Sequence, residues 1–409
     1  MLDVASLRRQ FPSLNRPRNG RLPVFLDSPG GTQVPQVVID AITRYLTTCN
    51  ANHGGLFATS RESDAILHEA NQAVANLLNA PSADDIVFGQ NMTSLTFHVS
   101  RSIARTWKPG DRILVTRLDH DANVSPWCLA ARDAGVEVRF VDFRPEDCTL
   151  DMDDLRRQLT PGTKLLALTC ASNAVGTLPD VKTAVRLAHE AGALVYLDAV
   201  HYAPHGPIDV QAWDCDFLAC SAYKFFGPHV GILWGRRGLL ESLSPYKVRP
   251  APETIPDRWM TGTQNHEGIA GVAAAVDYLA GLAPSAGGDR RTRLLSAMVA
   301  VKQYETDLCR RLLQGLAERP RFRVRGIADL NRLAERAPTV SITAKDHTAE
   351  QMALHLAQRE LYTWNGNFYA LELTERLGEE ERGGLLRLGL VHYNTADEVA
   401  RLLQALDDL

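Results

Sequence analysis

Cys220–Ser221–Ala222–Tyr223–Lys224–Phe225–Phe226–Gly227–Pro228 is the stretch from which the fold and the chemistry can be worked out. It lies between two apolar runs, Phe217–Leu218–Ala219 and Gly231–Ile232–Leu233–Trp234, so the pattern predicts strand, polar turn, strand. A lysine on a short turn among apolar neighbours loses hydration, which lowers its pKa and leaves a neutral amine able to form a Schiff base. On this stretch alone, an ordinary surface-turn lysine fits equally well.

A regular alternation of strands and helices precedes this turn. Strands are predicted at 86–88, 112–116, 136–141, 164–170, 193–197 and 216–220, with helices at 93–107, 125–134, 152–159 and 180–191 between most of them. This order predicts an α/β fold with a mostly parallel sheet of about seven strands, covered by helices on both faces. We expect Gly231–Trp234 to be an antiparallel neighbour of the strand before the lysine.

The last third of the chain has a different pattern, which predicts a smaller α+β domain. Its strands are expected at 322–325, 338–343 and 386–390, and its helices at 290–317, 348–358 and 395–406. Ala283–Asp289 is rich in Gly, Pro and Ser and is the expected linker. We therefore predict a large domain, residues 25–285, and a small domain made of residues 1–24 and 286–409. The charged segment 375–384 is expected to be a mobile loop.

Composition and charge exclude several classes of protein. The 409 residues are 45% hydrophobic and 22% charged, as in ordinary globular proteins. A net charge of −4 with both signs dispersed gives no reason to expect nucleic acid or a membrane as partner. No apolar run is long enough to span a membrane, and the N-terminus has no secretory pattern. The seven scattered cysteines form no Cys-x-x-Cys pair, so we expect neither a disulfide framework nor a zinc site. A reducing, cytoplasmic location fits this pattern best.

Polar side chains follow the predicted strands at the edge where ligands bind in open parallel sheets. Gly89–Gln90–Asn91–Met92–Thr93–Ser94 opens a helix whose free N–H groups could bind an anion, although an ordinary helix cap has the same pattern. His120 follows the next strand. A loop histidine is usually a surface residue, but at a strand end it can stack on a flat cofactor.

Asp198 directly follows an apolar run, so its charge is partly buried and needs a partner. A pyridinium N–H is such a partner. Metal ligation with His201 is the alternative, but no third ligand lies at a recognisable spacing. An anion site, a ring stacker, an acid for a ring nitrogen and a lysine are together what pyridoxal 5′-phosphate (PLP) requires, so we predict this cofactor.

An ordered set of motifs resembles a known family. The motifs are Asp119–His120–Asp121–Ala122–Asn123, Ala171–Ser172–Asn173, Asp198–Ala199–Val200–His201, Ser221–Ala222–Tyr223–Lys224 with Gly227–Pro228, Thr261–Gly262–Thr263 and Arg387–Leu388–Gly389–Leu390–Val391–His392–Tyr393–Asn394–Thr395. With them, the chain resembles fold-type I PLP enzymes of the class V aminotransferase group, in the cysteine desulfurase/selenocysteine lyase branch. The likeness covers nearly the whole chain, from Phe25–Leu26–Asp27–Ser28 to the last predicted helix.

The resemblance implies three catalytic residues. Lys224 would be the Schiff-base lysine and the acid/base at Cα and C4′, and Asp198 would pair with the pyridine nitrogen. His120 would stack on the ring and take part in proton transfer. The other cofactor-binding residues implied are Asn91, Met92, Thr93, Asn173, His201, Ser221, Tyr223 and Thr263.

The resemblance also implies a substrate and a partner. Arg387 would clamp the α-carboxylate of an amino acid, a task suited to a planar bidentate donor. Asn173, Trp364 and Tyr369 would complete the substrate pocket. Thr263 would reach the phosphate of the neighbouring subunit, which implies a homodimer with shared active sites.

The departures from the family pattern bear on the reaction. His201 stands where desulfurases usually have glutamine, Tyr223 where they usually have histidine, and Trp364 at a second arginine position. Desulfurases carry their sulfur-accepting cysteine near Thr363–Trp364–Asn365–Gly366–Asn367–Phe368–Tyr369–Ala370, and this chain has no cysteine after Cys309. A persulfide mechanism needs a thiolate at that place.

We therefore expect a lyase that cleaves a Cβ–S or Cβ–X bond of an amino acid by β-elimination, without an enzyme persulfide. One alternative is an aminotransferase or epimerase on the same scaffold, in a specialised biosynthetic pathway. From another class, the alternative is a catalytically silent protein that binds PLP or a sulfur carrier.

Overall fold

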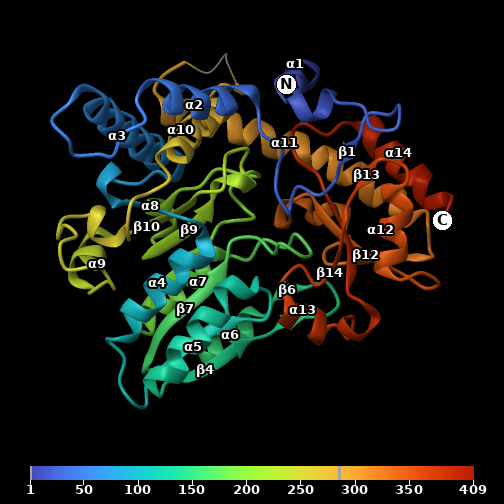
Figure 1. Ribbon diagram of the computed structural model, residues 1–409. Helices are drawn as coiled ribbons and strands as arrows, with labels where there is room; N and C mark the ends of the chain where they lie inside the picture. The colour runs from blue at the N-terminus through green and yellow to red at the C-terminus, as the bar shows by residue number, and fades with distance from the viewer. Residues whose placement is uncertain (1, 284–286) are drawn as a thin grey trace.

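A seven-stranded sheet forms the centre of the larger part of the molecule in this computed structural model, which describes residues 2–283 and 287–409 (Figure 1). In order across the sheet, its strands are β2 (Ile86–Gly89), β10 (Gly231–Gly235), β9 (Phe217–Ser221), β8 (Leu194–Asp198), β7 (Thr163–Thr169), β3 (Arg112–Thr116) and β4 (Glu137–Val141). Strand β10 is antiparallel to both neighbours, and the other pairs are parallel. The predicted mostly parallel sheet and its antiparallel strand after the lysine turn are confirmed.

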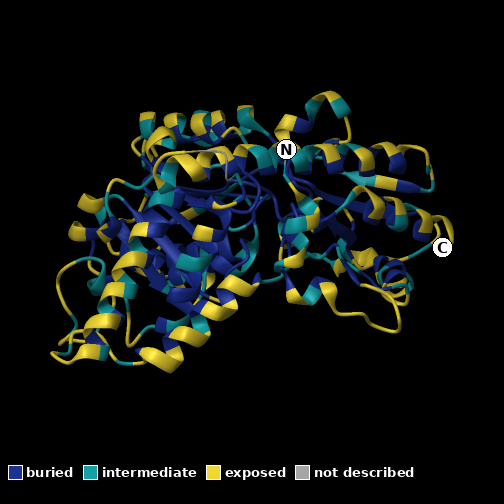
Figure 2. Cartoon of the chain, turned by 90° about the horizontal axis from the view of Figure 1, so that it is seen from above, coloured by how far each residue is buried: buried dark blue, intermediate teal, exposed yellow. Residues whose placement is uncertain are grey.

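Both faces of this sheet are buried along its inner strands, whereas the edge strand β4 is partly exposed. Successive residues of β7 alternate between two apolar clusters, with Leu166 and Leu168 in one and Leu165 and Ala167 in the other. A strand buried on both faces has apolar residues at every position, which explains why these strands appear as continuous apolar runs in the sequence. Figure 2 shows the strands buried, with exposed residues on the outer helices.

Helices cover each face of the sheet. On one face lie α2 (Gln36–Thr48), α3 (Ala58–Leu78), α6 (Met152–Gln158), α7 (Val181–Glu190), α8 (Val210–Trp213) and α10 (His266–Ala280). On the other lie α4 (Met92–Ala104), α5 (Ser125–Ala134) and α9 (Arg237–Ser242). A short hairpin, β5 (Phe143–Arg144) and β6 (Thr149–Leu150), follows β4.

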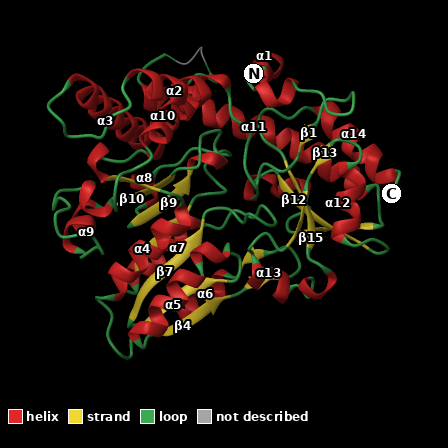
Figure 3. Ribbon diagram, viewed as in Figure 1, coloured by secondary structure: helices red, strands yellow, loops and turns green. Residues whose placement is uncertain are grey.

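The C-terminal part contains a four-stranded antiparallel sheet (Figure 3). Its strands, in order, are β11 (Phe322–Arg325), β12 (Thr339–Ala344), β15 (Leu385–Gly389) and β14 (Trp364–Gly366). It shares an apolar cluster with α11 (Arg290–Ala317), α12 (Ala349–Ala357) and α14 (Ala396–Asp407). The expected smaller α+β unit is therefore present.

The N-terminal segment lies on this C-terminal part. After α1 (Val4–Arg9), strand β1 (Val24–Phe25) pairs in parallel with β13 (Leu361–Tyr362). The domain limits stay a prediction, and the limit expected between residues 285 and 286 lies outside the described residues.

The segment 375–384 is not the simple loop that we expected. It contains the end of α13 (Leu371–Arg376) and a short 3-10 turn, Glu380–Arg382. The buried Glu379 is paired with Arg325, and Glu380 accepts hydrogen bonds from Thr374 (2.6 Å) and Asn367 (2.9 Å). Two of the charges that suggested solvation, those of Glu379 and Glu380, are instead bonded to protein groups.

None of the helices in the described part of the chain is long and apolar enough to cross a membrane.

Candidate active site

A cavity of about 650 Å³ lies at the carboxyl ends of the parallel strands. Of the eleven predicted cofactor residues, ten line it: Asn91, Met92, Thr93, His120, Asn173, Asp198, His201, Ser221, Tyr223 and Lys224. Residues from five separate segments of the sequence thus meet at one place, because parallel strands end at the same edge of a sheet.

The N-terminus of α4 forms one end of this cavity. Asn91 caps the helix, with its Oδ1 accepting a hydrogen bond from the Ser94 N–H (2.9 Å), and the Met92 N–H donates to Ser221 Oγ (2.9 Å). Strand β10 passes so close that a Cβ on Gly231 would overlap the backbone of Asn91, so only glycine fits there. Backbone N–H groups and the positive end of the helix dipole make this a suitable site for a phosphate group.

Lys224 lies on the 3-10 turn Ala222–Lys224, directly after β9. Its Nζ donates hydrogen bonds to the carbonyl oxygens of Pro29 and Gly30 (3.1 Å for Gly30). Burial, followed by the positive charge of Arg387, lowers the pKa of Lys224 to about 7. Near pH 7 about half of the amine is therefore neutral and available as a nucleophile.

Asp198 ends β8 and is buried in the cavity wall. Its Oδ1 accepts a hydrogen bond from the Val200 N–H (2.8 Å). Burial raises the pKa of Asp198 to about 6, and the Val200 N–H and Lys224 oppose this rise. In the described part of the chain, no group of three His, Cys, Asp or Glu residues could hold a metal ion, so metal ligation by Asp198 and His201 gains no support.

His120 presents its ring to the cavity and is held from behind by Tyr369. The Ala122 N–H donates to His120 Nδ1 (3.0 Å), and the Tyr369 ring is stacked on the histidine at 5.5 Å between centroids and 27° between planes. Burial, with Lys224 and Arg387 contributing, lowers the pKa of His120 to about 4, so the imidazole is neutral. A neutral ring fixed in this way is able to stack on a flat ligand.

Arg387 lies next to the cavity but is not part of its wall. The residue is only 4% exposed, and its Nη1 donates to the Asn173 carbonyl oxygen (3.0 Å). The Phe368 ring covers the guanidinium, with 4.2 Å between the ring centroid and Cζ. Burial lowers the pKa of Arg387 to about 9, while Asp27 raises it.

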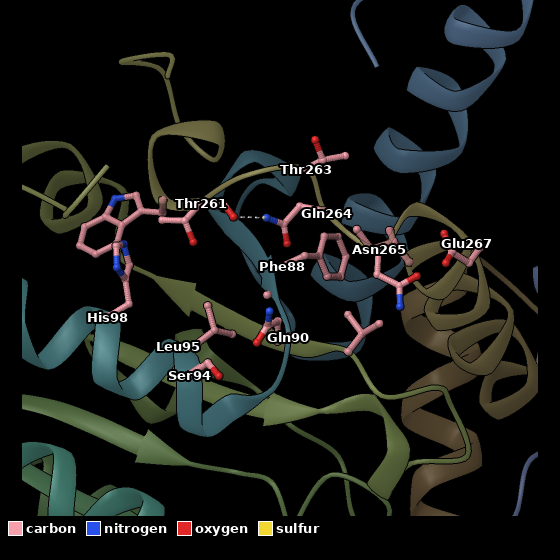
Figure 4. Close-up of a pocket in the computed structure, with 14 residues that line it drawn as sticks. Phe88, Gln90, Ser94, Leu95, His98, Thr261, Thr263, Gln264, Asn265 and Glu267 are labelled. Atoms are coloured by element: carbon pink, nitrogen blue, oxygen red, sulfur yellow. Dashed lines mark hydrogen bonds between the residues drawn. The ribbon is translucent and has the colours of Figure 1, made fainter. Parts of the chain in front are cut away.

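The remaining predicted site residues lie outside the cavity. Trp364 and Tyr369 are exposed, the latter by 72%; Trp364 lies against Gly30, and Tyr369 is stacked on His120. Thr263 lines a neighbouring cavity of about 580 Å³, where Figure 4 shows it beside Gln264, across from Gln90 and Ser94 at the start of α4. Within one chain, the structure therefore does not bring these three residues onto the wall of the predicted site.

Sequence reasoning missed several residues of the site. His229 lines the cavity and is stacked on Tyr223 (5.0 Å between centroids, 17° between planes). Asp27 pairs with Gly389 in a β-bridge, and burial raises its pKa to about 6 against the influence of Arg387 and Lys224. In this region the sequence offered only the family likeness that begins at Phe25–Leu26–Asp27–Ser28. Nothing in it indicated that the carbonyls of Pro29 and Gly30 contact Lys224, 195 and 194 positions away.

Comparisons with known proteins identify the family. The family described as aminotransferase class V matches residues 24–402 of this chain. The chain belongs to this family.

Its curated relatives cover the chain almost completely. A cysteine desulfurase of Serratia proteamaculans is 32% identical over 98% of this chain and 97% of its own length. An aminotransferase-like protein, FGM3, of Gibberella zeae is 31% identical over 99% of this chain and 98% of its own length.

Solved structures agree with this assignment. The cysteine desulfurase CsdA of Escherichia coli is 29% identical with a TM-score of 0.85, and the match covers 100% of this chain and 98% of that chain. The apo cysteine desulfurase of Thermococcus onnurineus, 23% identical with a TM-score of 0.89 and the same coverage, shares the fold. The fold is thus that of the fold-type I PLP enzymes, as predicted.

Enzymes of this family use PLP, and the residues of the cavity fit this cofactor. The α4 terminus suits its phosphate, and Lys224 and Asp198 are a buried amine and a buried acid. Asn173 Oδ1 is a buried acceptor without a protein partner among the described residues, as expected where a ligand supplies one. The protein is a PLP-dependent enzyme.

Proposed function

We propose that this enzyme cleaves a Cβ–S or Cβ–X bond of an amino acid by β-elimination, without forming a persulfide on the protein. One observation carries the proposal: no cysteine lines the described cavity, and Phe368 and Tyr369 occupy the segment that lies against His120 and Arg387. A desulfurase-type transfer needs a thiolate there to accept the sulfur.

The cysteines of this chain support the same conclusion. Six of the seven are buried, and Cys128 is half-buried. Burial raises the pKa of Cys128 to about 11 and of Cys148 to about 12, and it also raises the pKa of Cys170, Cys215, Cys220 and Cys309. Thiols with raised pKa values are poor nucleophiles at neutral pH, which suits a structural role.

The described residues can supply the steps of an elimination. When bound, PLP supplies an electron sink for a bond broken at the α-carbon. Lys224, as a neutral amine, accepts the proton from Cα, and Asp198 holds the proton of the ring nitrogen. The leaving group departs from Cβ with the bonding electron pair. With sulfur as leaving atom, the products are a thiol, pyruvate and ammonium, and one water molecule is consumed.

Arg387 is our candidate for binding the α-carboxylate. Its Nε is buried without a protein partner among the described residues, so one donor of the guanidinium is free for a ligand. The Phe368 ring covers one face of this guanidinium and leaves the donors in its plane to a carboxylate. We infer that Phe368 helps to hold Arg387 in place.

Product analysis tests the proposed reaction. S-substituted cysteines should yield pyruvate and ammonium with no keto acid present, whereas an aminotransferase would stop after one turnover until a keto acid is added. The similarity to an aminotransferase-like protein makes this the second candidate. An epimerase would exchange the α-hydrogen with solvent and release no pyruvate, and a silent binder would show no spectral change with any amino acid. The elimination is contradicted if no S- or O-substituted amino acid yields pyruvate.

We also infer a homodimer with shared sites. Thr263 lies outside the cavity of its own chain, and this placement is consistent with a role in the neighbouring subunit. Mixing inactive Lys224→Ala and Thr263→Ala chains should restore activity, because one kind of site in the hybrid has neither change. Finally, seven free thiols support the proposal of a reducing, cytoplasmic location.

A further inference from the structure

Buried histidines connect the cofactor cavity to the C-terminal part of the molecule. His201, in the cavity wall, is hydrogen-bonded through Nε2 to Thr339 Oγ1 of β12 (3.0 Å). Its ring packs against the ring of His205 at 5.1 Å between centroids, with 72° between the planes. Both histidines are only 4% exposed. Buried side-chain contacts therefore attach the turn that follows Asp198 to the C-terminal part.

Glu305 of α11 completes this chain of contacts. Its Oε2 is hydrogen-bonded to His205 Nδ1 (2.8 Å), and the residue is 1% exposed. Burial raises the pKa of Glu305, and His205 opposes the rise because the two groups attract each other when both are charged. A buried carboxylate without this histidine would be costly, so the pair specifies one arrangement of the two side chains.

Other charged or titratable groups also lie near His201, His205 and Glu305. Lys224 and Arg387 also act on His201, and both, together with burial, favour its neutral form. His205 lies near His392, which is bonded to Tyr278 (2.6 Å). Around Glu305, a small cleft is lined by His205, Lys302, Cys309 and Arg336. The contacts of Glu305 with His205 and of His205 with His201 thus form a polar connection between α11 and the cavity.

We propose that Glu305 and His205 are positioning residues that hold the His201 ring in its place beside the cofactor. Thr339 and His205 contact His201 from two directions, so the ring cannot rotate while both contacts last. Glu305 in turn fixes His205. Thr339 belongs to β12 and Glu305 to α11. The orientation of the His201 ring therefore depends on the position of the C-terminal part relative to the cavity. This inference rests on the proposed role of the cavity as the PLP site.

Two readouts with matched variants test the proposal. Glu305→Gln keeps the shape and the acceptor but removes the charge, and His205→Gln removes the ring. Asp307→Asn is the control, because Asp307 lies on the exposed side of the same helix. In cofactor-free protein with ¹⁵N-labelled histidine, both test variants should shift the His201 ring signals, which a His201→Gln sample assigns. In PLP-loaded protein, they should move the midpoint of the absorbance pH titration by about half a pH unit or more.

The outcomes separate positioning from simple stabilisation. If the test variants lower the melting temperature but leave the His201 signals and the titration midpoint as in the wild type, Glu305 and His205 only join two parts of the fold and the proposal is wrong. If Glu305→Gln does not fold, His205→Gln carries the same comparison. If borohydride fails to fix PLP on Lys224 in the wild type, the cofactor assignment is wrong, and the signals of the cofactor-free protein alone decide the histidine proposal.

Discussion

Replacing Lys224 with methionine should stabilise the cofactor-free protein while abolishing its activity. The fold lowers the pKa of Lys224 from its usual 10.5 to about 7, chiefly by burial. At pH 7 the unfolded chain carries this lysine fully charged in water, whereas the folded chain must desolvate it or release its proton. Methionine has a similar length and no charge, so it fills the same space without this cost.

The size of the effect follows from the pKa change. At 1.36 kcal/mol per pKa unit, a depression from 10.5 to about 7 corresponds to roughly 5 kcal/mol of unfavourable burial. The variant also leaves the Pro29 and Gly30 carbonyls without the lysine donor, at a cost of about 1 kcal/mol each. The expected net gain in the free energy of unfolding at pH 7 is therefore roughly 3 kcal/mol.

The difference in stability between the variant and the wild type should change with pH in a defined direction. Between pH 7 and pH 10.5 the unfolded chain binds more protons at this lysine than the folded chain does, so the stability of the wild type rises with pH across this range. The variant lacks this contribution. Its advantage over the wild type should therefore be largest at pH 7 and should shrink towards pH 10.

Urea denaturation of the cofactor-free proteins at pH 7 and pH 10 measures both quantities. Lys182→Met is the matched control, because Lys182 is exposed on α7 and its substitution should change stability little at either pH. The reasoning is refuted if Lys224→Met unfolds at the same urea concentration as the wild type, or at a lower one, at pH 7. It is equally refuted if the difference between the two proteins is the same at both pH values.

Three further predictions concern binding. The rate of PLP uptake should rise about tenfold from pH 6 to pH 8, because the neutral fraction of Lys224 rises with pH around a pKa of about 7; a flat stopped-flow profile would contradict this. Tyr369→Ala should weaken PLP binding about two- to tenfold by removing the ring behind His120, while Tyr369→Phe should keep wild-type affinity in equilibrium titrations. Arg387→Lys keeps the charge but loses the planar fork, so the KM for the amino acid should rise about tenfold or more, and an unchanged KM would remove Arg387 from the site.

The sequence was sufficient for the parts of the fold that depend on local pattern. Apolar runs such as Leu165–Leu168 mark strands buried on both faces, and the polar residues that follow them meet because parallel strands share an edge. Asp198 could be chosen on this basis alone. Arg387 could not, since a single arginine in a strand of the second sheet has no pattern of its own, and only the family resemblance indicated it.

Other features of the site depend on contacts that leave no trace in a sequence. The carbonyls of Pro29 and Gly30 bind Lys224 through the backbone, which every residue type offers. Phe368 and Tyr369 both have a positive φ of 58°, and this unusual conformation turns one ring over Arg387 and the other onto His120. Neither residue type favours that conformation, so the local sequence could not predict it.

Because β1 pairs in parallel with β13, the first strand of the chain has no partner until β13 has been synthesised. Val24 pairs with Leu361, a residue added 337 positions later, and at about 5–20 residues per second a ribosome needs roughly 20 to 70 s to cover that distance. The carbonyls that bind Lys224 belong to Pro29 and Gly30, shortly after β1, so the lysine turn emerges long before its partners are held in place. In a nascent chain that is released early, Lys224 would therefore lie in an unfinished pocket, where its amine is hydrated, charged and unreactive.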